Sequence, residues 1–133
     1  MKTHSIAVAV TLALIAMPSY AEWTELHPTK DGNAYIDKAN VVRNGQILQF
    51  RWLIDAVVDS EASKSVIVTS EINCNKRLIR HQQVVEYSEH MAAGNVIGTY
   101  PMTNQWIVVQ RGSTFSGFAS KFCYVVDKLP TKE

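Results

Sequence analysis

Two cysteines are the residues of this 133-residue sequence with the clearest potential for chemistry. Cys74 ends a β-rich stretch, and Cys123 lies in the late segment 113–126. In an exported chain two cysteines most simply pair, and closing a loop of about fifty residues removes unfolded-state entropy worth about 4 kcal/mol. A reactive or intermolecular thiol pair is the alternative. We therefore predict a disulfide between Cys74 and Cys123.

The sequence contains no nucleophile elbow, phosphate-binding loop or paired-histidine zinc motif. The segment Gly112-Ser113-Thr114-Phe115 does not match a nucleophile elbow. His81 and Glu86 are five residues apart in an expected strand, so they face opposite sides and form a poor acid–base pair. Three histidines lack the spacing of metal ligands: His27, His81 and His90. We predict no enzyme, metal or cofactor, and a catalytic site assembled only in space remains the third hypothesis.

A small basic cluster is the best candidate for a binding site. The chain has 13 Lys and Arg against 12 Asp and Glu, so its overall charge favours neither nucleic acid nor an anionic surface. Lys76, Arg77 and Arg80 follow Cys74 closely, and Arg51 is expected on the outward face of a nearby strand. These four residues are predicted to bind an acidic segment of a protein partner. Ordinary solvated charge is the alternative.

The first 21 residues have the layout of a secretory signal. A short basic start precedes an apolar run over residues 6–17, and Ala21 follows small residues at the spacing of a cleavage site. The apolar run is shorter than the ~20 residues that span a bilayer. We predict cleavage between Ala21 and Glu22, leaving one exported domain over residues 22–133 without a transmembrane span. No cysteine ends the apolar run, so a lipoprotein anchor is not expected.

Alternating apolar residues predict an antiparallel sheet. Residues 22–26 and 34–37 are short strand candidates, and Asn44-Gly45 between 41–43 and 46–54 predicts a two-residue type I′ hairpin. From residue 46 to 54 one face is apolar and the other polar, which is typical of a half-buried strand. The residues of the apolar face are Leu48, Phe50, Trp52 and Ile54.

The second half of the chain predicts further strands and one helix. Residues 65–74 and 105–110 are strand candidates, 77–88 is a strand whose register is not readable, and 89–104 is predicted to be a loop. An apolar stripe at helical spacing predicts a helix over 113–126 with Ser113 as N-cap, against a rival strand at 122–126. Together these elements predict an α+β fold of about five to six antiparallel strands, with a C-terminal helix on one face of the sheet.

Aromatic residues and sheet edges offer further contact points. Tyr100 and Trp106 are interpreted as core or rim residues, with a role as binding hot spots as the alternative. An edge strand also favours strand addition or dimerisation.

A set of ordered features runs through most of the chain: Trp23, Tyr35-Ile36-Asp37, Arg43-Asn44-Gly45, Phe50-Arg51-Trp52, Ser65, Glu71-Ile72-Asn73-Cys74, Arg77, Tyr87, Trp106, Gly112-Ser113 and Cys123. In this order they resemble the surface-adhesin protein E family of Gram-negative bacteria. The resemblance implies an antiparallel sheet with a disulfide-tied C-terminal helix, often as a dimer. It also implies an outer-surface role in binding matrix or serum proteins such as vitronectin and laminin.

Two functional hypotheses follow, and they place the protein in different cellular locations. The first is an exported, non-enzymatic adhesin-like module at the cell surface or secreted, which binds a host protein. The second is a periplasmic accessory or inhibitor protein whose partner is bacterial, such as a hydrolase. Fold transfers between relatives more safely than function, so the location of the chain separates the two hypotheses.

Overall fold

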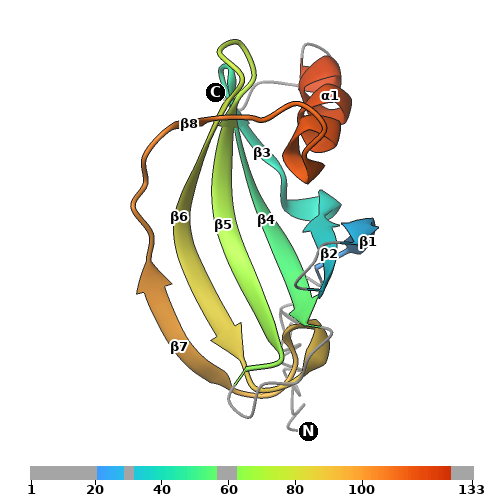
Figure 1. Ribbon diagram of the computed structural model, residues 1–133, viewed down its shortest axis with the longest axis vertical. Coiled ribbons are helices and arrows are strands. Elements are labelled where there is room, and N and C mark those ends of the chain that lie inside the picture. Colours follow the sequence, from blue (N-terminus) through green and yellow to red (C-terminus); the bar gives the residue numbers. More distant parts are fainter. Residues whose placement is uncertain (1–20, 29–31, 57–62, 127–133) are drawn as a thin grey trace, which may run out of the picture.

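An antiparallel sheet and one C-terminal helix make up the part of the chain that the computed structural model describes, residues 21–28, 32–56 and 63–126 (Figure 1). The sheet has a main path of strands in the order β1-β2-β4-β5-β6-β7, while β3 pairs with β4 and β8 pairs with β6. The elements are β1 (Trp23–Pro28), β2 (Gly32–Asp37), η1 (Lys38–Asn40), β3 (Val42–Asn44), β4 (Ile47–Ala56), β5 (Ser65–Asn73), β6 (Leu78–Tyr87), η2 (His90–Ala92), β7 (Val96–Pro101), β8 (Ile107–Val108) and α1 (Thr114–Val126). The predicted α+β architecture is confirmed.

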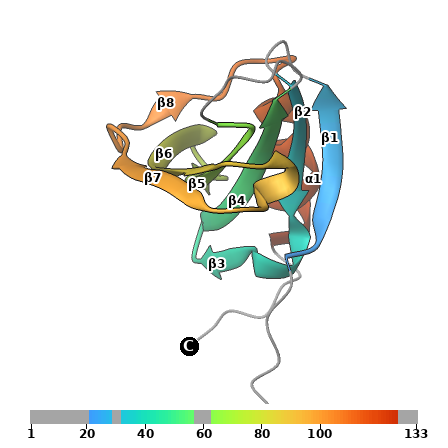
Figure 2. The same cartoon turned by 90° about the horizontal axis from the view of Figure 1, so that it is seen from below.

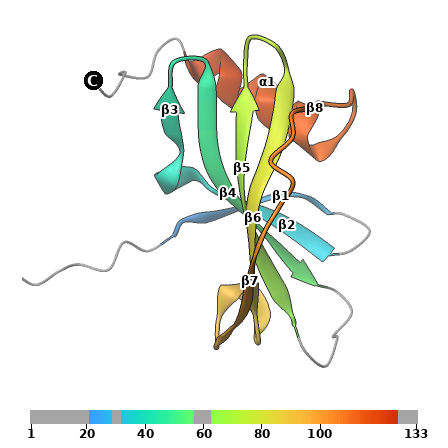
Figure 3. The same ribbon diagram turned by 90° about the vertical axis from the view of Figure 1, so that its left-hand side faces the viewer.

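The sheet is strongly twisted. Seen from below, β1 and β2 run in a very different direction from β7 at the other end of the sheet (Figure 2). The helix α1 lies across the upper part of one face (Figure 3). The right-handed twist of β-strands accumulates over the sheet, so a single short helix covers only part of it.

The core forms where α1 meets this face. Phe50 of β4 packs on Phe118 of α1 with ring centroids 4.2 Å apart, and Phe118 in turn stacks on Phe122 at 4.5 Å. The alternation expected for β4 holds from Leu48 to Trp52, since Leu48 and Phe50 are fully buried and Trp52 packs partly buried against the Phe50 cluster. It does not extend to Ile54, which is half-buried, while Leu53 is fully buried on the other face. Other buried members of the cluster are Ile36, Ile72, Ile79, Val109 and Ala119.

A disulfide fixes the helix to the sheet. Cys74 directly follows β5 and is bonded to Cys123 of α1, with 5.4 Å between the Cα atoms and 49 residues of sequence separation. The predicted pairing is therefore confirmed. The helix begins as expected, because the Ser116 N–H donates to the Ser113 Oγ at 3.2 Å. The rival strand at 122–126 is excluded by α1.

The hairpin between β3 and β4 differs from the prediction by one residue. Asn44 pairs with Ile47, so the two loop residues are Gly45 and Gln46, not Asn44 and Gly45. Gly45 has a φ of +61°, whereas Gln46 is not among the residues with positive φ. Positive φ at the first central residue alone defines a type II′ turn, for which glycine is the favoured residue. The I′ prediction was wrong because Asn44 continues the strand.

A β-bulge explains why the register of β6 was not readable. Ser70 faces His81, but the preceding Thr69 faces Gln83, so Gln82 is an extra residue in β6. An extra residue shifts the alternation of side chains to the opposite face. Ile79 and His81 therefore share a face with Val84, although their sequence spacing predicts otherwise.

Two predictions in the segment 89–110 were wrong. Residues 96–101 form β7 and not a loop, and the strand expected over 105–110 is limited to Ile107–Val108 of β8. Gly98 and Pro101 suggested a loop, but β7 is an edge strand ending at Pro101, and an edge tolerates proline. β8 is short because it pairs only with Leu78 and Ile79 at one end of β6, whereas β7 pairs with residues 83–87.

Two glycine substitutions should have opposite effects on stability. A Cβ added at Gly45 or at Gly117 would contact nothing within 4 Å, but only Gly45 has a positive φ. Gly45→Ala should lower the free energy of unfolding by about 1–2 kcal/mol, since alanine disfavours this backbone region. Gly117→Ala, inside α1, should raise it by about 0.5–1 kcal/mol. Urea unfolding with the disulfide intact measures both, and equal signs would contradict the turn assignment.

Removal of the disulfide should destabilise the fold strongly. The double substitution Cys74→Ser and Cys123→Ser releases a constraint over 49 residues and should cost about 4 kcal/mol of unfolding free energy. Chemical denaturation of this variant against the oxidised protein checks the value. Either single substitution serves as a control, because it also breaks the bond. A double variant as stable as the oxidised chain would show that packing alone secures α1.

Candidate functional site

The four predicted binding residues fall into two groups. Arg51 and Arg80 lie on the sheet and are ion-paired. Arg51 contacts Asp37 through Nη2 and Oδ2 at 2.5 Å, and Arg80 contacts Glu71 through Nη2 and Oε2 at 2.6 Å. The charges of both arginines are balanced by these carboxylates within the sheet.

Arg80 has a second partner that limits its role further. Its guanidinium lies over the ring of Trp106, 4.3 Å from the centroid. A cation over an indole face is attracted by the ring quadrupole. Trp106 is therefore half-buried and covers the ion pair of Arg80 with Glu71.

Asp37 is the centre of the other ion pair and is fully buried. Burial opposes ionisation of its carboxyl. Hydrogen bonds from Arg51 and Asn40, the charge of Arg51 and the Glu22 N–H nevertheless lower the pKa of Asp37 below its ordinary value. The carboxylate is thus held ionised inside the protein, and it ties the start of β1, the end of β2 and the middle of β4 together.

Lys76 and Arg77 form the second group and lie exposed in the turn between β5 and β6. Arg77 has a φ of +52°, and its carbonyl accepts the N–H of Val109 at 3.0 Å. This bond brings the segment after β8 beside the turn. The two cations line a surface hollow with Val108, Val109, Gln110 and Arg111. Arg111 was missed by the sequence prediction, because only the tertiary contact brings it to this turn.

Exposed apolar side chains continue from this hollow along one side of the molecule. They belong to β7, β8 and the segment between them: Val96, Ile97, Tyr100, Met102, Ile107 and Val108. Tyr100 is 50 % exposed and Val108 is 64 % exposed. Figure 1 shows β7 and β8 running along one margin of the sheet. We call residues 96–111 together with Lys76 and Arg77 the β7–β8 margin.

The outer side of β7 has no neighbour in the order of strands that the structure describes. Unpaired N–H and C=O groups at such an edge are available to an added strand. A Cβ at Gly98 would clash with the phenolic oxygen of Tyr100, so glycine is needed for this ring to lie across the strand. The margin therefore combines an open strand edge, apolar side chains and three cations.

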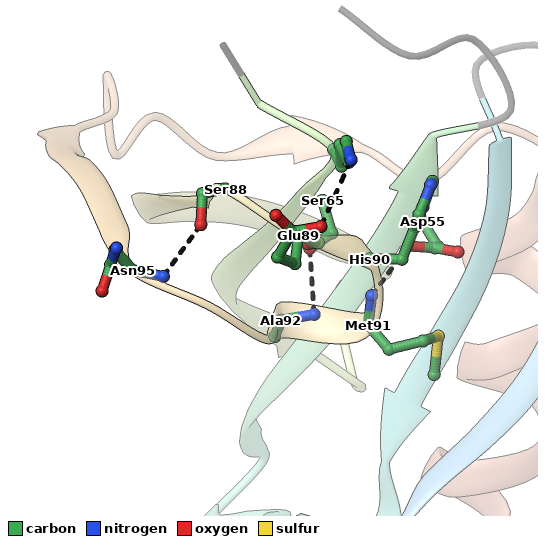
Figure 4. A network of polar contacts seen from close by, with 9 residues as sticks. Asp55, Ser65, Ser88, Glu89, His90, Met91, Ala92 and Asn95 are labelled. Atoms are coloured by element: carbon green, nitrogen blue, oxygen red, sulfur yellow. Dashed lines mark hydrogen bonds and ion pairs between the residues drawn. The ribbon is translucent and has the colours of Figure 1, made fainter. Parts of the chain in front are cut away.

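A polar network holds the connection between β6 and β7 in place (Figure 4). The Ser65 hydroxyl donates to the Glu89 carbonyl at 2.5 Å and accepts the Ala92 N–H at 2.9 Å. The Met91 N–H donates to Asp55 Oδ1 at 2.8 Å. Since Ser65 lies on β5 and Asp55 on β4, these bonds anchor η2 to the sheet and give β7 a defined starting point.

A buried serine–histidine contact lies under α1. Trp52 Nε1 donates to Ser70 Oγ at 2.9 Å, and Ser70 Oγ lies 2.7 Å from His81 Nδ1. With neutral His81 the serine hydroxyl donates to Nδ1, and the imidazole packs on Phe115 with centroids 5.6 Å apart. Ser70 is 0 % exposed, so its hydroxyl is placed to bridge two rings and not to attack a substrate. Burial lowers the pKa of His81.

Two further findings bear on the kind of site. In residues 21–28, 32–56 and 63–126, no three His, Cys, Asp or Glu side chains come together as a group that could hold a metal ion. No helix within these ranges is long and apolar enough to cross a membrane.

The half-buried His81 predicts a stability that depends on pH. A lowered pKa means that the unfolded chain takes up the proton first, so stability is complete above about pH 6.5 and decreases below it, by at most about 1.4 kcal/mol per pH unit. His81→Asn keeps an acceptor but does not titrate, so it should flatten this dependence. Urea unfolding at pH 7.5 and 5.5 measures the effect, with Ser70→Ala as the control that still titrates. Equal slopes for the protein and His81→Asn would contradict it.

Comparison with known proteins identifies the family. A family model described as surface-adhesin protein E matches residues 23–124. The fold is similar to the selenomethionine form of Haemophilus influenzae protein E, at 17 % identity and a TM-score of 0.62, covering 83 % of this chain and 93 % of that one. A second structure of Haemophilus influenzae protein E matches at 18 % identity and a TM-score of 0.60, with 88 % and 96 % covered.

Protein E from non-typeable Haemophilus influenzae matches at 16 % identity and a TM-score of 0.60, covering 87 % of this chain and 86 % of that one. No curated protein sequence matches at a significant level. The structural likeness shows the shared fold, and the family model covers most of the chain, including the sheet, both cysteines and nearly all of the helix. This chain belongs to the surface-adhesin protein E family.

Proposed function

We propose that the chain is an exported, non-enzymatic adhesin-like module that binds a host matrix or serum protein, such as vitronectin or laminin, through the β7–β8 margin. The observation that carries the proposal is the arrangement of Lys76, Arg77 and Arg111 around one hollow, beside the exposed apolar row of β7 and β8. Large exposed apolar groups next to cations are typical of protein-interaction surfaces.

The chemistry of the margin favours an acidic partner segment with apolar side chains. Arginine supplies directional, weakly hydrated donors to carboxylates, and Ile107 and Val108 offer apolar area beside them. Arg51 and Arg80 are each paired with a carboxylate. They therefore shape the face next to the margin, while their charges are already balanced within the sheet. Cations at the rim mainly accelerate and orient association, while the apolar row provides the contact area.

A second candidate is a periplasmic accessory or inhibitor protein with a bacterial partner, such as a hydrolase. The same margin would serve as its contact surface. The two candidates differ in location, and protease treatment of intact cells distinguishes them: cleavage of the native protein favours the adhesin, and protection favours the periplasmic role.

Charge reversal in the hollow should weaken binding. The triple substitution Lys76→Glu, Arg77→Glu and Arg111→Glu should reduce the affinity for purified vitronectin or laminin at least tenfold, measured by solid-phase binding at fixed salt. The control is the double reversal Lys38→Glu with Lys121→Glu, because Lys38 of η1 and Lys121 of α1 are exposed and line a different hollow. Unchanged binding by the triple variant, or equal loss in the control, would contradict the assignment of the margin.

A further inference from the structure

The nitrogen of Glu22 lies against the buried carboxylate of Asp37. The Glu22 N–H donates to Asp37 Oδ1 at 3.3 Å, across 15 residues of sequence. The other carboxylate oxygen, Oδ2, accepts from Asn40 at 2.7 Å and from Arg51 at 2.5 Å. One oxygen thus has two strong donors, one of them charged, whereas Oδ1 faces a neutral amide at the long end of the hydrogen-bond range.

We propose that cleavage of the Ala21–Glu22 bond converts this amide nitrogen into an α-ammonium group that forms an ion pair with Asp37. A leader-cleaving endopeptidase would catalyse the step. Water adds to the bond, its oxygen ends in the new carboxylate of Ala21, and the released amine of Glu22 is protonated at neutral pH. The proposal rests on the expected cleavage site and not on the proposed binding function.

The geometry needs no rearrangement for this contact. Trp23 already pairs with Asp37 in the ladder between β1 and β2, and the Lys38 N–H donates to the Glu22 carbonyl at 3.3 Å. The carbonyl of Glu22 is therefore fixed on one side and its nitrogen is directed at Oδ1 on the other. A charged donor to a carboxylate forms a shorter and stronger hydrogen bond than an amide does.

The charges around Asp37 favour a second cation. Asp37 is 0 % exposed, while the Arg51 side chain is 40 % exposed and reaches the carboxylate from the solvent side. A buried carboxylate gains most from a partner that is itself held in place, and Arg51 engages only one of its two oxygens. The Glu22 ammonium would occupy the other, so that processing completes the set of donors and ties the end of β1 to the sheet.

The first test locates the cut in the exported protein. The full chain with its own leader is expressed in an exporting bacterial host, purified from the exported fraction and measured by intact mass spectrometry. A mass that begins at Glu22 is expected. A mass that begins at any other residue would overturn the proposal.

The second test measures the ion pair itself. Chains beginning at Glu22 and at Ala21 are released from a cleavable fusion, each with Asp37 and with Asp37→Asn, and their urea unfolding is compared at pH 7. The chain with a free Glu22 amine should have a folding equilibrium constant about tenfold or more above that of the Ala21 chain. This difference should disappear with Asp37→Asn. Equal stability of the two Asp37 chains, or an undiminished difference between the two Asp37→Asn chains, would overturn the proposal.

A third chain, which begins at Glu22 and is acetylated on its α-amine, tests the proposal even if the Asp37→Asn variants do not fold. Acetylation of the Glu22 α-amine removes the charge while Asp37 and Arg51 stay intact. The acetylated chain should be as weakly stable as the chain beginning at Ala21. An acetylated chain as stable as the free amine would show that the charge at residue 22 does not contribute.

Discussion

The contact between Phe50 on β4 and Phe118 on α1 is the interaction on which the rest of the structure depends, because it joins the only α-helix of the described residues to the sheet. A small domain has little apolar surface to bury, so one aromatic seam provides much of the driving force for folding. The disulfide between Cys74 and Cys123 acts on the same seam. It prevents α1 from leaving the sheet and limits the freedom of the unfolded chain.

On the opposite face of the sheet, two ion pairs lie on the same side as buried apolar residues such as Leu53 and Ile67. Asp37 with Arg51, and Glu71 with Arg80, link neighbouring strands where no helix covers them. The partner of each charge lies close, so burial of Asp37 does not leave an isolated ion. Because these two arginines are used within the sheet, the cations that line the hollow come from turns and loops: Lys76, Arg77 and Arg111.

The position of the β7–β8 margin follows from the topology of the sheet. β7 and β8 share one edge of β6, with an irregular segment between them, and the hydrogen bonds of Ser65 and Asp55 fix the entry to β7. Binding residues commonly lie on such connecting segments, because the scaffold positions them while their backbone stays accessible. Family membership alone does not identify the partner, since related folds carry different sites.

The sequence by itself determined the α+β class, the disulfide, the N-cap at Ser113 and the apolar face of β4, because each depends on local spacing or on residue type. It did not determine the bulge at Gln82 or the II′ turn at Gly45, because both are set by pairing with another strand. It placed Arg80 in a binding patch, whereas its neighbours Glu71 and Trp106 are known only from the folded sheet. The grouping of Arg111 with Lys76 and the contact of Glu22 with Asp37 were likewise decided by the tertiary structure. The energy of an interaction between polar or charged groups depends on the distance between them, and a linear sequence does not contain that distance.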